Sequence, residues 1–248
     1  MTDITYDLSL LEASEAKWKS SPALRYIYGR FYQQALGWIV DGPCLELGAG
    51  IGAGRELIPG LVTSDLVQTR FVDQAEDCYE VTRHPDGWSG LLAIDVFHHL
   101  TEPLRFLESA AKALRPGGRL VLVEPAATPV AMPLYNRFHV EPMRPSELDP
   151  PFSFDVDEKG EFANMGMAVA LFLHHREWFE AHCEELGLRL LEVKFSDPLA
   201  YPLTGGYSGR QRLPDSCIRF LGKFEKILPS FIHRLFGWRM TVVLEACN

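Results

Sequence analysis

Four closely spaced glycines are the feature of this 248-residue chain that points most directly to a bound cofactor. They follow the apolar run Cys44–Leu47, and they are Gly48, Gly50, Gly52 and Gly54. Glycine allows backbone conformations that other residues avoid, and it lets a ligand approach the main chain without a Cβ in between. Dinucleotide-binding loops have the spacing G-x-G-x-x-G/A, which Gly48, Gly50 and Ala53 satisfy, with Asp65 downstream as a ribose acceptor. The loop predicts a nucleotide-type cofactor and leaves its class open.

Further sequence blocks favour one class of cofactor. Glu46 precedes the first glycine by two residues and completes the pattern Glu-x-Gly-x-Gly-x-Gly. The other blocks, in chain order, are Thr63–Asp65, Asp77–Cys78, Leu91–Leu100 and Ala113–Pro125. Together they cover the first half of the chain and resemble the class I S-adenosylmethionine-dependent methyltransferases of the small-molecule type. The resemblance implies an α/β fold with a Rossmann-like sheet of seven strands, mostly parallel with an antiparallel last strand, and helices on both faces.

The same resemblance implies S-adenosylmethionine as the cofactor and S-adenosylhomocysteine as the product. The backbone of the glycine loop would approach the methionyl part, Asp65 would accept hydrogen bonds from the ribose, and Asp77 with the Cys78 main chain would contact the adenine edge. Glu46 would mainly brace the loop, with direct contact to the ligand as the alternative. The expected cofactor-binding residues are Glu46, Gly48, Ala49, Gly50, Gly52, Asp65, Asp77, Cys78, Asp95 and Tyr28. Tyr28 and Tyr32 would face the sulfonium through cation–π contact, or else simply pack a helix face.

Three polar residues end the predicted strand Leu91–Val96. Asp95 lies in this apolar run, and His98 and His99 follow it. An acid in such a place is costly unless it has a partner, which predicts a polar pocket floor. His98 is a candidate catalytic residue and part of the cofactor wall, with a structural helix-capping histidine as the alternative. No third ligand at metal spacing accompanies the two histidines in the sequence, so no metal site is expected.

A second group of polar side chains lies in the proline-rich segment after the predicted strand Leu120–Glu124. Tyr135–Pro142 combines a phenol, an amide, an imidazole and a carboxylate. His139 is the candidate general base, because a neutral imidazole can accept a hydroxyl proton near neutral pH; the alternative is a histidine that only bonds backbone. A bacterial methyltransferase subgroup is similar at His139, Glu141, Asn164 and Thr204–Ser208.

Composition excludes several classes of function. The net charge of −9 and the pI near 5.4 argue against nucleic acid as a partner, because phosphate binding needs a basic face. The five cysteines are scattered and form no C-x-x-C pair, which indicates reduced thiols and a cytoplasmic protein. We expect no signal peptide and no transmembrane segment.

The predicted elements are brief buried strands and amphipathic helices within one domain, 1–248. An N-terminal helical cover is expected at 1–40, with a short helix followed by a longer one that begins at Pro22. An inserted lid is expected at 125–170. The strands are expected at Cys44–Gly48, Leu61–Asp65, Phe71–Ala75, Leu91–Val96, Leu120–Glu124, Leu188–Phe195 and Met240–Glu245. A shortened helix is expected at Leu66–Arg70, and crossover helices at Pro103–Leu114, closed by Arg115–Gly118, and Arg176–Leu186.

An amphipathic segment, 205–239, precedes the last strand. Within it, Ile218–Trp238 carries several basic residues among many apolar ones. The favoured interpretation is a helix that faces the core and exposes its basic side. The alternative is peripheral contact with a membrane surface, without stable insertion.

These observations predict methyl transfer to a small-molecule or lipid-like acceptor, at oxygen rather than at nitrogen or carbon. Two alternatives remain. An NAD-dependent oxidoreductase has a similar sheet, although no Tyr-x-x-x-Lys pair is apparent. A non-catalytic protein could keep the nucleoside site and have lost the chemistry.

Overall fold

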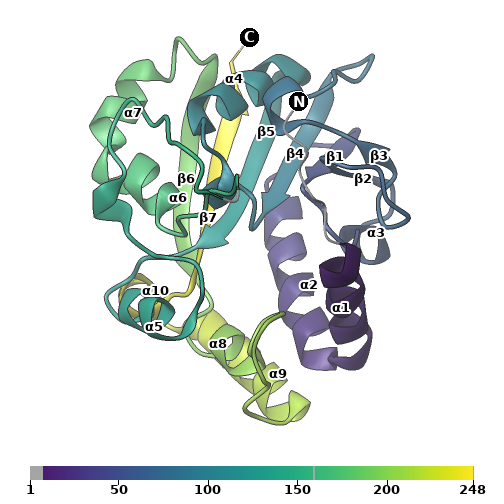
Figure 1. Ribbon diagram of the computed structural model, residues 1–248, viewed down its shortest axis with the longest axis vertical. Coiled ribbons are helices and arrows are strands. Elements are labelled where there is room, and N and C mark those ends of the chain that lie inside the picture. Colours follow the sequence, from purple (N-terminus) through teal and green to yellow (C-terminus); the bar gives the residue numbers. More distant parts are fainter. Residues whose placement is uncertain (1–7, 159, 248) are drawn as a thin grey trace.

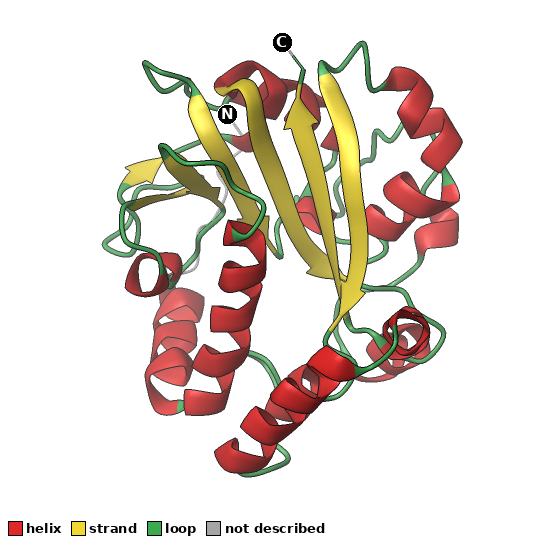
Figure 2. Cartoon of the chain, turned by 180° about the vertical axis from the view of Figure 1, so that it is seen from behind, coloured by secondary structure: helices red, strands yellow, loops and turns green. Residues whose placement is uncertain are grey.

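The computed structural model describes residues 8–158 and 160–247, and it has one central sheet with helices on both faces (Figures 1 and 2). The strand order is β3-β2-β1-β4-β5-β7-β6. Strand β7 runs antiparallel to both of its neighbours, and the other six strands are parallel to one another. The strands are β1 Cys44–Leu47, β2 Leu61–Asp65, β3 Gln74–Ala75, β4 Trp88–Ile94, β5 Leu114–Pro125, β6 Leu188–Ser196 and β7 Arg239–Ala246. The predicted fold class is confirmed.

The helices fall into long covers and short turns. The α-helices are α1 Leu8–Ser20, α2 Pro22–Leu36, α3 Gly54–Leu57, α4 Pro103–Ala113, α5 Ala131–Phe138, α6 Met167–Val169, α7 Arg176–His182, α8 Ala200–Thr204, α9 Asp215–Phe224 and α10 Ser230–Phe236. The other helical turns are η1 Cys78–Glu80, η2 Phe97–His99, η3 Pro145–Glu147, η4 Ala170–His174 and η5 Glu225–Ile227. Helix α2 begins where the sequence predicts, because Ser21 caps it by accepting a hydrogen bond from the Leu24 N–H and Pro22 occupies the first turn.

Alternate residues of each central strand enter two different cores. In β5, Leu120 and Leu122 pack with α4 and the lid segment, while Val121 and Val123 pack with α2. Side chains of a strand point alternately to the two faces, so a sheet covered on both sides needs a continuous apolar run. This packing fixes the carboxyl ends of β1 and β4, where the candidate site lies.

Three expected local structures differ. The third strand is only Gln74–Ala75, shorter than the expected Phe71–Ala75. The predicted helix Leu66–Arg70 is a loop. Just after it, Asp73 accepts hydrogen bonds from the Thr63 N–H and hydroxyl, both at 2.8 Å. The expected turn Arg115–Gly118 lies within β5, which begins at Leu114 and passes through an irregular register before Arg119 pairs with Gly90. Tertiary pairing decided each of these short segments.

The interpretation of Ile218–Trp238 as a core-facing helix is wrong for most of its apolar side chains. Of this stretch, Ile218 and Gly222 are buried, whereas Phe220 is 68% and Ile227 is 78% exposed. The segment breaks into α9, η5 and α10, which lie beyond the carboxyl ends of β4 and β5 beside α5 and α8 (Figure 1). Among the described residues, none of the helices has the length and hydropathy needed to cross a bilayer.

Candidate functional site

The glycine loop joins β1 to α3 and has three residues with positive φ. These angles are 65° at Gly48, 55° at Gly50 and 63° at Gly52, a region that favours glycine. A Cβ on Gly52 would lie 2.0 Å from the Phe71 carbonyl oxygen, so this glycine is required by packing. Among the described residues, a Cβ on Gly50 would meet only the Leu11 side chain, at 3.9 Å. The described residues thus leave room beside the Gly50 backbone, and Gly48, Ala49 and Gly50 are all half-buried.

Glu46, two residues before the first glycine of this loop, contacts α2 inside the protein. It is buried and accepts a hydrogen bond from the Tyr32 hydroxyl at 2.5 Å. Its Oε2 has no hydrogen-bond partner among the described residues. Burial raises the pKa of Glu46 to about 8. The loop-bracing role expected for Glu46 stays a prediction, and the hydrogen bond from Tyr32 joins Glu46 to α2.

Two acids, Asp65 and Asp77, were expected from the sequence to contact the adenosine of the cofactor. Asp65, at the end of β2, accepts the Gly50 N–H at 2.8 Å through Oδ2 and the Leu66 N–H at 2.8 Å through Oδ1. A carboxylate can accept about four hydrogen bonds, so capacity remains for a ligand. Asp77 is exposed and caps η1 through the Tyr79 N–H at 2.8 Å, next to the half-buried Cys78.

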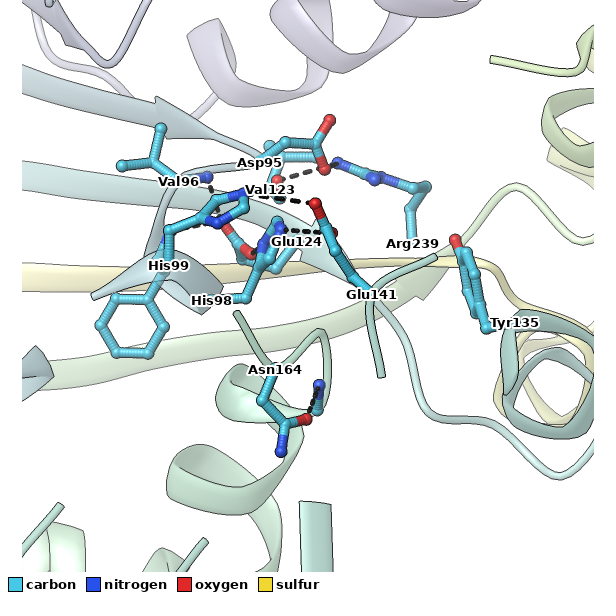
Figure 3. A network of polar contacts seen from close by, with 12 residues as sticks. Asp95, Val96, His98, His99, Val123, Glu124, Tyr135, Glu141, Asn164 and Arg239 are labelled. Atoms are coloured by element: carbon cyan, nitrogen blue, oxygen red, sulfur yellow. Dashed lines mark hydrogen bonds and ion pairs between the residues drawn. The ribbon is translucent and has the colours of Figure 1, made fainter. Parts of the chain in front are cut away.

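Asp95 is held at the end of β4 by two residues from distant parts of the chain, of which Figure 3 shows Arg239. Arg239, at the start of β7, lies 2.6 Å from Asp95 Oδ1 and also donates to the Val123 carbonyl. The Tyr28 hydroxyl donates to Asp95 Oδ2 at 3.1 Å. Asp95 has a φ of 59°, which is rare for a residue with a Cβ, while its side chain remains 28% exposed. Strain of this kind persists where the surroundings over-determine the backbone, and here Arg239 and Tyr28 hold the carboxylate in place.

His98 links the sheet to the segment after α5 (Figure 3). Its Nδ1 lies 2.5 Å from Glu124 at the end of β5, and its Nε2 lies 3.4 Å from Glu141. Glu124 is fully buried and also accepts the Val96 and Phe97 N–H groups, both at 2.9 Å. Both ring nitrogens of His98 are therefore engaged with carboxylates.

The charges in this group stabilise one another. Burial by itself would lower the pKa of His98, but the charge and hydrogen bond of Glu124, with a further bond to Glu141, raise the pKa to about 10. The hydrogen bond from His98 lowers the pKa of Glu141 to about 2. The pKa of Glu124 is lowered as well, since His98 and the N–H donors outweigh its burial. At neutral pH, His98 is an imidazolium between two carboxylates.

Two more imidazoles flank Glu141. Burial, then the charge of His98, lowers the pKa of His99 and keeps it neutral. One ring nitrogen of His99 bonds to the Phe162 backbone, and Nε2 lies 3.9 Å from Glu141 Oε1 on a side chain that is 44% exposed. His139 Nδ1 accepts the Glu141 N–H at 3.3 Å and lies 3.9 Å from its carboxylate.

The ligand atoms of His98, His99 and Glu141 lie within 4.8 Å of one another. From the sequence, no third ligand is expected near the histidine pair. That expectation is wrong, because the fold brings Glu141, more than 40 residues away in the sequence, next to both histidines. A proton on His98 accounts for its contacts with Glu124 and Glu141 without a metal ion. The expectation that there is no metal stays a prediction.

Three residues near Asp95 and His98 were not singled out from the sequence, namely Glu124, Arg239 and Tyr201. Tyr207 lies in Thr204–Ser208, which was noted by resemblance. Tyr207 packs against Tyr28 with ring centroids 5.1 Å apart, after a turn in which Gly205 and Gly206 have positive φ. Arg239 had a usable signal, since it is a single cation at the start of an otherwise apolar strand. Asn164, noted by resemblance, has a structural role, bonding the Arg144 backbone through its side chain and donating its own N–H to the His98 carbonyl.

Comparison with known proteins supports the fold. No protein-family model matches this chain, and no curated protein does. Among solved structures, it is similar to a SAM-dependent methyltransferase from Archaeoglobus fulgidus, with a TM-score of 0.54, 15% identity, and coverage of 97% of this chain and 100% of the other. It is also similar to the complex of the Haloferax volcanii Trm112 methyltransferase activator with a methyltransferase, with a TM-score of 0.51, 14% identity, and coverage of 98% and 99%. The chain has the fold of class I S-adenosylmethionine-dependent methyltransferases.

Proposed function

We propose that this protein is an S-adenosylmethionine-dependent methyltransferase that acts on a hydroxyl group of a small-molecule or lipid-like acceptor. One observation carries the proposal: the glycine loop follows β1, and the two strands beside β1 lead into carboxylates, with Asp65 at the end of β2 and Asp95 directly after β4. The loop follows β1 and Asp95 follows β4, and the strand order reverses between these two strands. Ligands of open α/β sheets bind at this point, outside the carboxyl ends of the strands.

The residues present suit an adenosyl sulfonium. Gly50 offers backbone that an added side chain would cover, and Asp65 keeps free lone pairs for a ribose diol. Asp77 and Cys78, at the start of η1, are proposed to contact the adenine edge. Asp95 and Tyr28 lie on the side nearest β4, where the cofactor wall is expected. Contact of Tyr28 with the sulfonium remains part of this proposal.

When bound, S-adenosylmethionine supplies an electrophilic methyl group with a good leaving group. The protein mainly has to align the acceptor with that carbon and keep water away. Tyr28, which is buried in α2, and Tyr207, in the turn after α8, pack against each other next to Asp95. The lid segment, 125–170, is proposed to cover the acceptor.

A hydroxyl acceptor loses a proton as it attacks, and the geometry favours His99 as the group that receives it. His99 is neutral, half-exposed and has one ring nitrogen bonded to backbone, which leaves the other as an acceptor. His98 and His139 were the catalytic candidates from the sequence. His98 already carries its proton, so we assign it to holding Glu141 in place. His139 accepts a backbone N–H through Nδ1, so its Nε2 is a donor that can orient the acceptor oxygen.

The first test is calorimetry with S-adenosylmethionine, S-adenosylhomocysteine and NAD. We expect the two adenosyl compounds to bind and NAD to fail. Dinucleotide-binding sheets are parallel through their sixth strand, whereas β7 here runs antiparallel between β5 and β6. Binding of NAD alone would instead support the oxidoreductase alternative.

The second test is turnover with a panel of phenols, sugar alcohols, lipid hydroxyls and amines, measured as S-adenosylhomocysteine released. Methylation of a hydroxyl acceptor supports the proposal. Tight adenosyl binding without turnover on any class would favour the non-catalytic alternative. The five cysteines are all free, which is consistent with the proposed cytoplasmic location.

A further inference from the structure

The exposed apolar side chains of this protein are concentrated on one part of its surface. Ten of the seventeen large hydrophobic residues that are exposed among those described come from 132–140 and 220–236, including all five exposed phenylalanines. The α9–α10 surface is defined here by Phe220, Phe224, Ile227, Phe231, Leu235 and Phe236, together with the exposed cations Arg219, Lys223, Lys226 and Arg234. Concentrations of this kind mark interaction sites, whereas single exposed apolar residues do not.

Cations and apolar side chains share the same helix faces. Phe220, Lys223, Phe224 and Ile227 have the spacing i, i+3, i+4, i+7, which places them on one stripe. On α10, the residues Phe231, Arg234 and Leu235 repeat the pattern. The four cations of the surface have no ion pair with a described residue, in a chain whose net charge is −9.

The segment Ile218–Trp238 exposes no acidic side chain on this surface. The one acid between Ile218 and Trp238 is Glu225, which is fully buried and paired with Arg30 of α2. Glu225 also accepts the N–H groups of Leu199 and Ala200, at 3.0 and 3.1 Å. The fold thereby anchors the segment through its acid and leaves only positive charge outside.

We propose that the α9–α10 surface docks on an anionic lipid bilayer. An interfacial helix places apolar side chains at the headgroup boundary and basic residues against lipid phosphates, and this surface presents both. A symmetric dimer through the same face would bring its cations together with their own copies, which disfavours self-association. The negative charge of the rest of the molecule would orient this face toward the membrane.

The surface also borders the candidate site at two points. Helix α5 lies against the end of α10, where the Val130 N–H donates to the Leu235 carbonyl and the Tyr135 hydroxyl donates to the Trp238 carbonyl. The chain after α5 passes through Val140, which is fully exposed, to Glu141 in the site. A bilayer under this surface would present amphiphilic acceptors beside the crevice. That last consequence rests on the proposed function; the docking does not.

The test is flotation of the full-length protein with phosphatidylcholine vesicles containing or lacking phosphatidylserine, without cofactor. We expect binding to the anionic vesicles alone, and its loss when ionic strength rises from about 0.1 M to about 1 M. Lys223→Glu with Lys226→Glu should weaken binding at least about twenty-fold, given roughly five-fold per cation. Ile227→Ser with Phe231→Ser should weaken it as well.

Two control variants, with matched substitutions elsewhere on the protein, test whether binding depends on the α9–α10 surface. Arg83→Glu with Lys194→Glu reverses two exposed cations elsewhere, and Leu10→Ser with Val156→Ser removes exposed apolar side chains elsewhere. Both should bind as the wild type does. The proposal is overturned by absence of binding to anionic vesicles at low salt, by equal binding of the α9–α10 variants, or by a stable dimer that Ile227→Ser with Phe231→Ser dissociates. Because no turnover is measured, failure here leaves the methyltransferase proposal standing, and failure of that proposal leaves this result unaffected.

Discussion

The two sides of the crevice are built in different ways. On the β1 side, the site consists of backbone contributed by neighbouring residues, Gly48 to Gly52, with φ angles that glycine adopts easily. On the β4 side, it consists of side chains from distant segments: His98 with Glu124 and Glu141, and Asp95 with Arg239. The first side is specified locally, and the second depends on the sheet being assembled.

Under the proposed function, this difference would separate cofactor binding from chemistry. A nucleoside cofactor that is shared by many enzymes can be held by a loop whose conformation depends on a few glycines. The acceptor side needs charged groups in a buried place, and burial of a charge is tolerated only with partners. Substitutions on the two sides should therefore fail in different ways.

Substitutions in the loop should have the largest effects and should separate packing from binding. Gly52→Ala should destabilise the protein by about 3–5 kcal/mol, because strained φ adds to a clash with the Phe71 carbonyl. Gly50→Val should fold, with a penalty of about 1–2 kcal/mol for its φ, yet lose at least about 100-fold in S-adenosylmethionine affinity. Thermal unfolding and calorimetry measure the two effects, and unchanged affinity of Gly50→Val would place the cofactor elsewhere.

On the opposite side, Glu124→Ala should cost about 3–5 kcal/mol of unfolding free energy, because it leaves the His98 imidazolium buried without its main partner. The double variant with His98→Leu should be less destabilised than the sum of the single variants, which denaturant unfolding would reveal. Glu147→Ala, at an exposed pair with Arg144, is the control and should change stability by less than about 0.5 kcal/mol. If the losses of unfolding free energy in the two single variants simply add in the double variant, Glu124 and His98 are not coupled.

The two half-exposed histidines should be distinguishable by turnover. His99→Ala should lower kcat by about 10²-fold or more, as expected for loss of a general base, while His139→Ala should lower it by about ten-fold. Cofactor affinity should remain unchanged in both variants, and the acid limb of the pH–rate profile should disappear only in His99→Ala. A larger loss in His139→Ala would reverse the two roles.

Stability should depend on pH through His98 and Glu141. The folded-state pKa of His98 is about 10 against 6.5 ordinarily, so its contribution is complete below about pH 6.5 and is lost as pH rises toward 10. The pKa of Glu141 is lowered from 4.5 to about 2, so its contribution is present above about pH 4.5 and is lost as pH falls toward 2. The stability difference between wild type and His98→Gln should therefore be greatest between these limits. A difference that grows above pH 8 would contradict the pairing.

Metal removal should have the smallest effect. Dialysis against EDTA should leave turnover unchanged, because a proton on His98 and a neutral His99 already account for the group around Glu141. Loss of turnover that Zn²⁺ or Mn²⁺ restores would show that this group binds a metal. The control is the same dialysis followed by addition of Mg²⁺ alone.

Prediction from sequence worked best where neighbouring residues decide the outcome. The glycine loop, the start of α2 at Pro22 and the apolar strands followed from conformational preference and from runs of buried residues. Prediction was poorest where a segment is short or amphipathic, as at Leu66–Arg70 and Ile218–Trp238. In such segments the local signal is weak, and packing with the rest of the chain decides.

The sequence by itself determined the sheet class, the glycine loop after β1 and the acid that ends β2, because these depend on spacing within a few residues. Only the tertiary structure decided that Glu124 orients His98 and stabilises its protonated form, that Arg239 fixes Asp95, and that the apolar face of α9 and α10 stays outside. The physical reason is that charge pairing and burial depend on distances in space, and those distances between remote residues exist only once the strands have paired.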